Sequence, residues 1–253
     1  MITNTDVKYR HIISLGHFCS VASEIERFGF RDKSYPFDWV LSKSFECVVK
    51  LINNRFEDYL KEDYLYQSPS IHWQYRNMEY NIEFVHDFSE WKSFDSQIED
   101  VRKKYQRRID SFYKAIQEPT FFIRYICDEK ELHFIEDNYH SIVEMIRSYN
   151  TNNSIVFVAN GALQRVRNED SEFKIYFVDP DENDTVSRKF LDSISELVEY
   201  IDQHYYSEEV KNSNLEFYQN KQRKKKRAKL TKKMKTFFHK LFSKRYIHNK
   251  IYQ

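Results

Sequence analysis

Cysteine is scarce in this chain, and three cysteines in 253 residues do not make an even disulfide framework. The first ten residues, MITNTDVKYR, also lack the pattern of a secretory leader, so we expect a reducing, cytoplasmic compartment. No stretch approaches the roughly 18–20 uninterrupted apolar residues of a membrane-spanning helix. Hydrophobic residues at 41% and aromatic residues at 17% instead predict a globular body with a sizeable core.

Several ligand-binding motifs are absent from the sequence. Neither G-x-G-x-x-G nor G-x-x-x-x-G-K-[ST] occurs, which gives no support to a nucleotide phosphate site. C-x-x-C and H-E-x-x-H do not occur either, so we expect no dedicated zinc site. The sequence therefore predicts neither a metal nor a cofactor.

Acidic residues are missing from the C-terminal part of the chain. Residues 221–253 contain 14 Lys or Arg and no Asp or Glu, although the whole chain has a net charge of only +1. Residues 1–220 keep 26 basic and 39 acidic residues, a net charge of −13. An acidic body with a strongly basic tail indicates that the tail has a partner of its own.

Apolar runs alternate with amphipathic stretches along the body. The predicted strands are 12–16, 80–88, 121–126, 154–160 and 174–179, and the predicted helices are 21–28, 44–56, 98–116, 138–149 and 186–204. Near-continuous apolar strands between helices predict an α/β fold with a mostly parallel sheet and helices on both faces. We expect a catalytic-like α/β domain over 1–210, followed by a basic linker and an amphipathic tail over 211–253.

The carboxyl ends of the predicted strands carry reactive side chains, and ligands bind at this edge of open α/β sheets. Cys19 follows the first strand, His86 ends the second, and Asn160 and Asp179 end the last two. Together they match a Cys-His-Asx nucleophilic site. In this hypothesis Cys19 attacks a carbonyl carbon and His86 moves the proton. Asn160 or Asp179 orients the histidine.

The strand-to-helix corner at Cys19 suits a nucleophile. Unpaired N–H groups at a helix N-terminus favour a thiolate over a thiol. Gly16 lets the backbone turn tightly, and the N–H groups of residues 16–20 form a candidate oxyanion hole. The alternatives are a small buried thiol at Cys19, a hydrogen-bonded core histidine at His86, and His17 as the rival base.

Candidate substrate-binding residues flank this corner. Gly16 and His17 belong to the turn itself, and Asp38 and Trp39 belong to the loop SYPFDW at 34–39. The alternative for Asp38 and Trp39 is a structural loop that its aromatic residues pin to the body.

Four blocks of the sequence resemble a known family when they are taken together and in order. They are SLGHFCSVA (14–22), FRDKSYPFDWV (30–40), EFVHDF (83–88) and YQRRIDSF (105–112). The family is bacterial, of unknown function, and labelled "putative papain-like cysteine peptidase". The resemblance spans roughly residues 11–125. It implies Cys19 as the nucleophile and His86 as the general base.

The sequence departs from a papain-type site in two respects. Such a site has a glutamine a few residues before the cysteine, and residues 12–18 contain none. A papain-like fold sets a helix beside an antiparallel barrel, whereas the strand pattern here predicts a parallel sheet. The resemblance therefore implies a thiol-dependent hydrolase or acyl-transfer enzyme, with peptidase, esterase, acyltransferase and transglutaminase-like activities all open.

A non-catalytic protein is the alternative hypothesis. The segment YLYQSPSIHWQYR (64–76) places aromatic faces beside polar groups, an arrangement that suits sugars. The chain would then be a glycan-binding or partner-binding module. In that case Cys19 would react with thiol reagents no faster than Cys47 or Cys127.

The tail pattern predicts a basic amphipathic helix. One narrow apolar face lies among lysines and consists of Met234, Phe237, Phe238, Leu241 and Phe242. Such a helix indicates an anionic membrane surface as the partner, ahead of nucleic acid or the acidic body itself. We expect residues 221–253 to be disordered in water and helical on the inner membrane. Similar tails occur on bacterial enzymes that assemble surface polysaccharides in the cell envelope.

Overall fold

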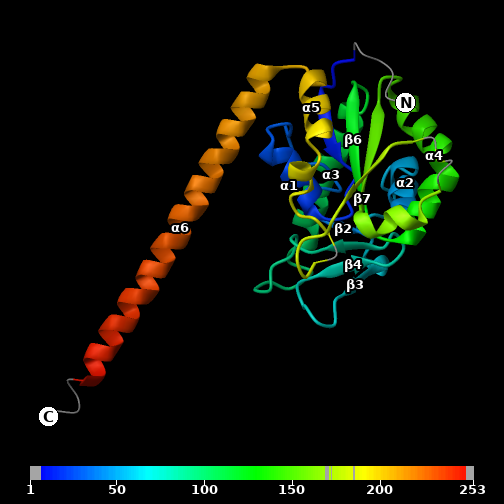
Figure 1. Ribbon diagram of the computed structural model, residues 1–253. Coiled ribbons are helices and arrows are strands. Elements are labelled where there is room, and N and C mark those ends of the chain that lie inside the picture. The colour runs from blue at the N-terminus through cyan, green and yellow to red at the C-terminus, as the bar shows by residue number, and fades with distance from the viewer. Residues whose placement is uncertain (1–6, 169–170, 172, 185, 249–253) are drawn as a thin grey trace.

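The computed structural model in Figure 1 describes residues 7–168, 171, 173–184 and 186–248, with side chains given through Thr236. The strands are β1 (His11–Ser14), β2 (Leu41–Ser42), β3 (Leu65–Gln67), β4 (Tyr75–Asn77), β5 (Ile82–Phe84), β6 (Thr120–Ile126), β7 (Ser154–Asn160) and β8 (Ile175–Val178). The α-helices are α1 (Cys19–Arg27), α2 (Phe45–Asn53), α3 (Ile98–Ala115), α4 (Glu129–Tyr149), α5 (Ser195–His204) and α6 (Glu208–His248). Three short 3₁₀ helices are η1 (Glu62–Tyr64), η2 (Gly161–Val166) and η3 (Phe190–Ser193).

Four parallel strands form the central sheet in the order β1-β6-β7-β8. Phe122 of β6 lies opposite Ile13 of β1, and Ile123 lies opposite Val156 of β7. The strands β1 and β6 are fully buried, because helices cover both sides of the sheet. The prediction of an α/β fold with a mostly parallel sheet is confirmed.

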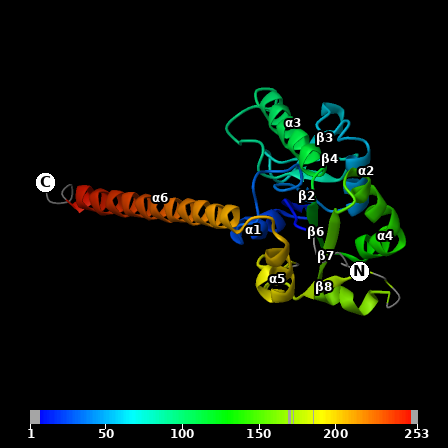
Figure 2. The ribbon, with the colours of Figure 1, turned by 90° about the horizontal axis from the view of Figure 1, so that it is seen from above.

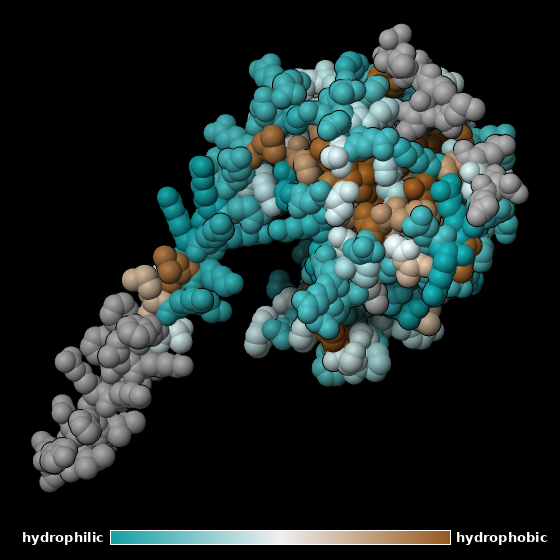
Figure 3. Space-filling model, viewed as in Figure 1, coloured by the Kyte–Doolittle hydropathy of each residue, from teal (hydrophilic) through white to brown (hydrophobic). Residues whose placement is uncertain are grey.

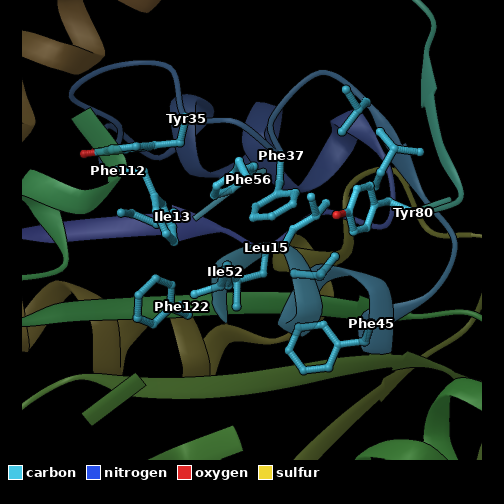
Figure 4. Packing of buried hydrophobic residues seen from close by; sticks show 14 of the residues in the cluster. Ile13, Leu15, Tyr35, Phe37, Phe45, Ile52, Phe56, Tyr80, Phe112 and Phe122 are labelled. Carbon is cyan, nitrogen blue, oxygen red and sulfur yellow. The ribbon is translucent and has the colours of Figure 1, made fainter. Parts of the chain in front are cut away.

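Alternate residues of β6 supply two separate hydrophobic cores. Phe121, Ile123 and Tyr125 pack with α1 and α5, whereas Phe122 and Ile126 pack with α2, α3 and α4. Figure 2 shows α5 on one side of the sheet and α2 and α4 on the other. The second core is rich in aromatic rings, and Figure 4 shows how they gather around the β1 segment. The sheet is thereby fixed from both faces.

A second, antiparallel sheet with the order β2-β5-β4-β3 was not predicted. The expectation that residues 80–88 form a strand of the parallel sheet is wrong, because only Ile82–Phe84 is a strand and it pairs with β2 and β4. Ile82 and Phe84 are buried while Glu83 between them is half-buried. This alternation is typical of an antiparallel sheet with one wet face.

The second sheet lies against the carboxyl edge of the parallel sheet (Figure 1). Ser42 N–H of β2 donates to the carbonyl oxygen of His17 at 2.9 Å. The His17 N–H donates in turn to Ser42 Oγ at 3.0 Å. The edge where ligands were expected is therefore partly covered by β2.

Two helices differ most from their predicted bounds. α4 begins at Glu129 rather than at residue 138, because Asp128 Oδ1 caps it by accepting from Glu131 N–H at 2.9 Å. The predicted helix 186–204 is divided into η3 and α5, because the backbone of Ile194 leaves helical geometry with φ −128° and ψ 64°.

The first turns of α6 are attached to the body at the end of α1. Gly29 lies two residues after the end of α1 and has a φ of +81°, a conformation that favours glycine. Asn214 Nδ2 donates to the Gly29 carbonyl oxygen at 3.0 Å, and Lys221 Nζ lies 2.6 Å from Glu26 Oε1. Since α6 begins at Glu208, the predicted boundary at residue 210 falls within its first turn.

Beyond this attachment α6 projects away from the body as a single rod (Figures 1 and 2). The sequence predicts disorder in water from residue 221, whereas the structure continues the helix to His248. Residues 207–248 contain no glycine and no proline, so no residue in that stretch breaks a helix whose first turns contact the end of α1. Among the described residues, no helix is long and apolar enough to cross a membrane.

Substitution of Gly29 by alanine tests the attachment of α6. An alanine at this position would have a positive φ, and its Cβ would lie 2.7 Å from the Lys211 carbonyl oxygen. We expect Gly29→Ala to lower the free energy of unfolding by about 2–4 kcal/mol, measured by urea denaturation. Gly161→Ala, where φ is not positive and the nearest atom belongs to the Asp179 side chain, is the matched control. Equal losses in the two variants would contradict the strained attachment.

Candidate functional site

Cys19 is the first residue of α1 and follows β1 after a strained turn. Gly16 and His17 have φ angles of +84° and +75°, and Phe18 occupies the N-cap without a capping side chain. A Cβ on Gly16 would overlap Ser42 Oγ, so this position needs glycine for space as well as for its φ. Cys19 itself is half-buried. A thiol at an uncapped helix N-terminus is thus fixed at the carboxyl edge of the sheet.

The predicted oxyanion hole is smaller than the sequence suggests. Of the N–H groups in residues 16–20, that of Gly16 donates to Ser14 Oγ and that of His17 donates to Ser42 Oγ, both at 3.0 Å. These two donors stabilise the turn and do not face a ligand. The remaining candidates are the N–H groups in the first turn of α1, which no side chain caps.

Arg124, in the middle of β6, is fully buried and connects the elements around this turn. Its Nη1 donates to the Leu15 carbonyl oxygen and to Ser42 Oγ, each at 2.8 Å. Its Nη2 donates to the Ser42 carbonyl oxygen at 2.6 Å, and its Nε donates to Glu131 Oε1 at 2.7 Å. One guanidinium therefore holds the end of β1, the strand β2 and the start of α4 together.

The other oxygen of Glu131 faces the imidazole of His17. His17 Nδ1 and Glu131 Oε2 are 3.8 Å apart, and both atoms are buried without a hydrogen-bond partner. The two side chains come from different elements, since His17 precedes α1 and Glu131 lies in the first turn of α4. A histidine and a carboxylate thus meet beside the turn that carries Cys19.

Cys127 lies at the end of β6 and is a second thiol at this edge. Burial, and then the charge of Glu131, raise the pKa of the Cys127 thiol well above its ordinary value. Burial also raises the pKa of nearby Tyr125 to about 12, and the Tyr125 hydroxyl accepts a hydrogen bond from Ser187 N–H at 3.1 Å. Cys127 is consequently a neutral, unreactive thiol near neutral pH.

His86 is not at the carboxyl edge of the parallel sheet. It lies in a bend two residues beyond β5, and its side chain is exposed. Within the described residues no hydrogen bond joins His86 to Cys19, so their pairing stays a prediction. The neighbouring Asp87 has a structural role, because its carboxylate accepts from the Tyr105 hydroxyl at 2.9 Å and pairs with Lys104 Nζ at 2.5 Å.

Asn160 and Asp179 lie at the carboxyl edge, as predicted, but on the far side of β6 from Cys19. Strand spacing places Asn160 of β7 about 10 Å and Asp179 after β8 about 14 Å from β1. Asn160 Oδ1 accepts from Ala162 N–H at 3.0 Å and caps η2, while Asp179 is exposed. Their role as residues that orient a histidine stays a prediction.

The loop with Asp38 and Trp39 is tied to Arg31. Asp38 is buried, and its Oδ2 accepts from Arg31 Nη2 and from Tyr35 N–H, each at 2.8 Å. Burial raises the pKa of Asp38, while the charge of Arg31 opposes this shift. The Arg31 guanidinium also stacks over the Trp39 ring at 4.8 Å. These contacts favour the structural interpretation of the loop over a substrate-binding one.

Arg124, Glu131 and Ser42 belong to the site but are not among the residues predicted from the sequence. Arg124 interrupts the apolar run FFIRYI, and a charged residue inside a buried strand requires a buried partner. Glu131 follows Asp128 with the spacing of a capping box. This local pattern explains a glutamate at the start of α4 and does not indicate its pairing with Arg124. In the part of the chain that the structure describes, no group of three His, Cys, Asp or Glu residues is arranged to hold a metal ion.

Removal of Arg124 tests whether this guanidinium stabilises the site. Arg124→Met leaves the Glu131 carboxylate buried and unpaired, so we expect a loss of about 3–5 kcal/mol in the free energy of unfolding. The double variant Arg124→Met/Glu131→Met removes both charges and should recover part of that loss. Lys174→Met, which breaks the exposed pair with Glu196, should cost about 0–1 kcal/mol. A double variant no more stable than Arg124→Met would contradict the assignment.

Comparison with known proteins gives three findings. A family model described as "Putative papain-like cysteine peptidase (DUF1796)" matches residues 10–161. "Uncharacterized protein R408" of Acanthamoeba polyphaga mimivirus is 25% identical over 167 residues, which cover 57% of this chain and 73% of the viral protein. No solved structure matches the chain. Since this relative is viral, a restriction of such sequences to bacteria is not supported.

Proposed function

Because the chain belongs to the family described as "Putative papain-like cysteine peptidase (DUF1796)", we propose that it is a thiol-dependent hydrolase or acyl-transfer enzyme with Cys19 as its nucleophile. The observation that supports this proposal best is the position of Cys19. It is the first residue of α1, after a strained turn at the carboxyl edge of a parallel sheet, with no side chain capping the helix. The N–H groups of the first helical turn, which no side chain caps, are positioned to stabilise negative charge that develops on a bound carbonyl oxygen.

The proposed reaction proceeds in two steps. A histidine nitrogen takes the proton of the Cys19 thiol, and the sulfur forms a bond with the carbonyl carbon of an acyl substrate. N–H groups in the first turn of α1 stabilise the resulting oxyanion. The carbonyl re-forms as the bond to the leaving amine or alcohol breaks, and the histidine returns the proton to that group. Water or an acceptor hydroxyl or amine then attacks the thioester, which releases the acyl group and restores the thiol.

The fold supports a broader reaction class than peptide hydrolysis. The central sheet is parallel, and residues 12–18 contain no glutamine to complete a papain-type oxyanion hole. Esters and thioesters are easier acyl donors than peptides because their leaving groups are better. We therefore propose acyl transfer from a carbonyl donor as the shared chemistry, with peptidase activity as one form of it.

Acetylation by p-nitrophenyl acetate tests the nucleophile without a known substrate. We expect a burst of p-nitrophenolate near one equivalent of protein, with one acetyl group on the Cys19 peptide by mass spectrometry. Cys19→Ser should abolish the burst, and Cys47→Ser should leave it unchanged. Cys127 should stay unmodified at neutral pH because its raised pKa keeps it as a neutral thiol.

Equal acetylation of Cys19 and Cys47 would overturn the enzyme proposal. The alternative is then a glycan-binding or partner-binding module that uses residues 64–76. That segment spans β3 and β4, and Tyr66 and Trp73 in it are exposed. Exposed aromatic rings on an edge of the second sheet are suited to stacking on sugar rings.

A second proposal concerns the partner of α6, which we propose is an anionic membrane surface. All described side chains from Arg223 to Thr236 are exposed, and they include nine Lys or Arg and no acid. Leu230 and Met234, one helical turn apart, are 61% and 51% exposed among these charges. Figure 3 shows α6 mostly hydrophilic, with a hydrophobic spot just before the grey atoms. Nucleic acid would not require these apolar side chains.

The predicted membrane-binding residues Phe237, Phe238, Leu241 and Phe242 lie in α6, but their side chains are outside the described residues. A link to envelope or polysaccharide assembly rests on this tail alone.

Vesicle sedimentation of the full-length protein tests the membrane proposal. We expect binding to phosphatidylglycerol vesicles that weakens as salt rises, because exposed charges are screened over about 8 Å at physiological ionic strength. Leu230→Asn/Met234→Asn should reduce binding severalfold at unchanged charge. Thr231→Asn on the same helix is the control and should bind like the wild type. Equal binding to neutral vesicles would contradict the proposal.

A further inference from the structure

We propose that Glu131 fixes the tautomer of His17 and that His17, not His86, is the base that serves Cys19. This inference rests on the proposed function for the role of Cys19, but the pairing of His17 with Glu131 is a separate claim. Glu131 is a positioning residue in this proposal, since it acts on the thiol only through the imidazole.

The first argument is the pair of buried atoms that face each other. The His17 side chain is 13% exposed and the Glu131 side chain 1%, and their Nδ1 and Oε2 atoms are 3.8 Å apart. Neither atom has another hydrogen-bond partner. A buried polar atom without a partner is costly, so each atom has a reason to approach the other. A closure of less than 1 Å brings them within hydrogen-bond distance.

The second argument is that the backbone of His17 is strained. A residue other than glycine at φ +75° is strained, and this conformation is kept only where surrounding contacts impose it. Here Ser42 bonds both the N–H and the carbonyl oxygen of His17, and Arg124 holds Ser42 in turn. This strained residue carries an imidazole and precedes the candidate nucleophile by two residues.

The charges around His17 determine which nitrogen is free. Glu131 of α4 faces Nδ1, the Arg124 guanidinium of β6 balances the charge of this carboxylate, and the Tyr125 ring and the neutral Cys127 thiol lie on the same edge. A carboxylate at Nδ1 favours the tautomer with the proton on Nδ1. The Nε2 nitrogen is then the basic one, which accepts the thiol proton.

His86 has no comparable surroundings. Its side chain is exposed, and the adjacent Asp87 carboxylate is directed to Lys104 and Tyr105. Nothing among the described contacts fixes the tautomer of His86. The structure thus distinguishes the two histidines that sequence analysis leaves as rivals.

Nitrogen-15 NMR of the imidazoles tests the pairing in the full-length wild-type protein. We expect neutral His17 as the Nδ1–H tautomer, whereas exposed His86 should show mainly the Nε2–H form that imidazoles prefer in water. Glu131→Gln should shift His17 away from the pure Nδ1–H form. A neutral His17 with its proton on Nε2 in the wild type would overturn the pairing, whatever the behaviour of the variants.

Alkylation of Cys19 by iodoacetamide tests the assignment of the base. His17→Asn removes the imidazole, and asparagine tolerates a positive φ, so the turn is retained. We expect this variant to slow alkylation of Cys19 at pH 7 about tenfold or more and to shift its pH profile upward, since less thiolate forms. His133→Asn, an exposed histidine two residues after Glu131, is the control and should react like the wild type.

The outcomes separate the inference from the proposed function. Slower alkylation of Cys19 in His86→Asn, together with an unchanged rate in His17→Asn, would overturn the assignment of the base. The Nδ1–H tautomer together with an unreactive Cys19 would overturn the enzyme proposal and leave the His17–Glu131 pairing intact. Because Glu131→Gln weakens the partner of Arg124 and can unfold the protein, the wild-type tautomer and His17→Asn decide the question without it.

Discussion

The arrangement of this protein depends on one buried ion pair, between Arg124 of β6 and Glu131 of α4. A guanidinium without access to water must place all of its N–H groups against acceptors. Here the acceptors are Glu131, Leu15 and Ser42, which belong to three different parts of the chain. Arg124 can be buried only if the end of β1, the strand β2 and the start of α4 meet at one point.

That meeting point explains why the second sheet covers the carboxyl edge of the first. β2 is only two residues long, and by itself it has little reason to stay beside the turn after β1. The hydrogen bonds of Ser42 to Arg124 and to the backbone of His17 hold it there. The same contacts maintain the positive φ of His17, so the strain at the site is balanced by interactions outside the turn.

Membership in a family labelled papain-like does not extend to a papain-like fold. The nucleophile here starts a helix after a parallel strand, and the neighbouring strands place Cys127, Asn160 and Asp179 along the same edge. In such a sheet the chemistry depends on which loops lie next to one another rather than on their order in the chain. The loop beside β1 follows β6, which brings Glu131 to the site.

Local patterns were sufficient to predict much of the fold. The apolar runs at 121–126 and 154–160 are β6 and β7, because a strand buried on both faces needs continuous apolar side chains. Gly16 and Cys19 predict a strand-to-helix corner, since a glycine turn and helical apolar spacing are both local signals. The alternation in 80–88 also showed a strand, but it did not show to which sheet that strand belongs.

Residue spacing over short stretches predicts the parallel sheet, its buried strands and the position of Cys19 at a helix start. Which side chains surround that thiol depends on contacts between distant parts of the chain. Arg124 and Glu131 are seven residues apart and Ser42 is 82 residues from Arg124, and no periodicity connects them. Their association follows from the requirement to satisfy a buried charge, which is met in space and not along the chain.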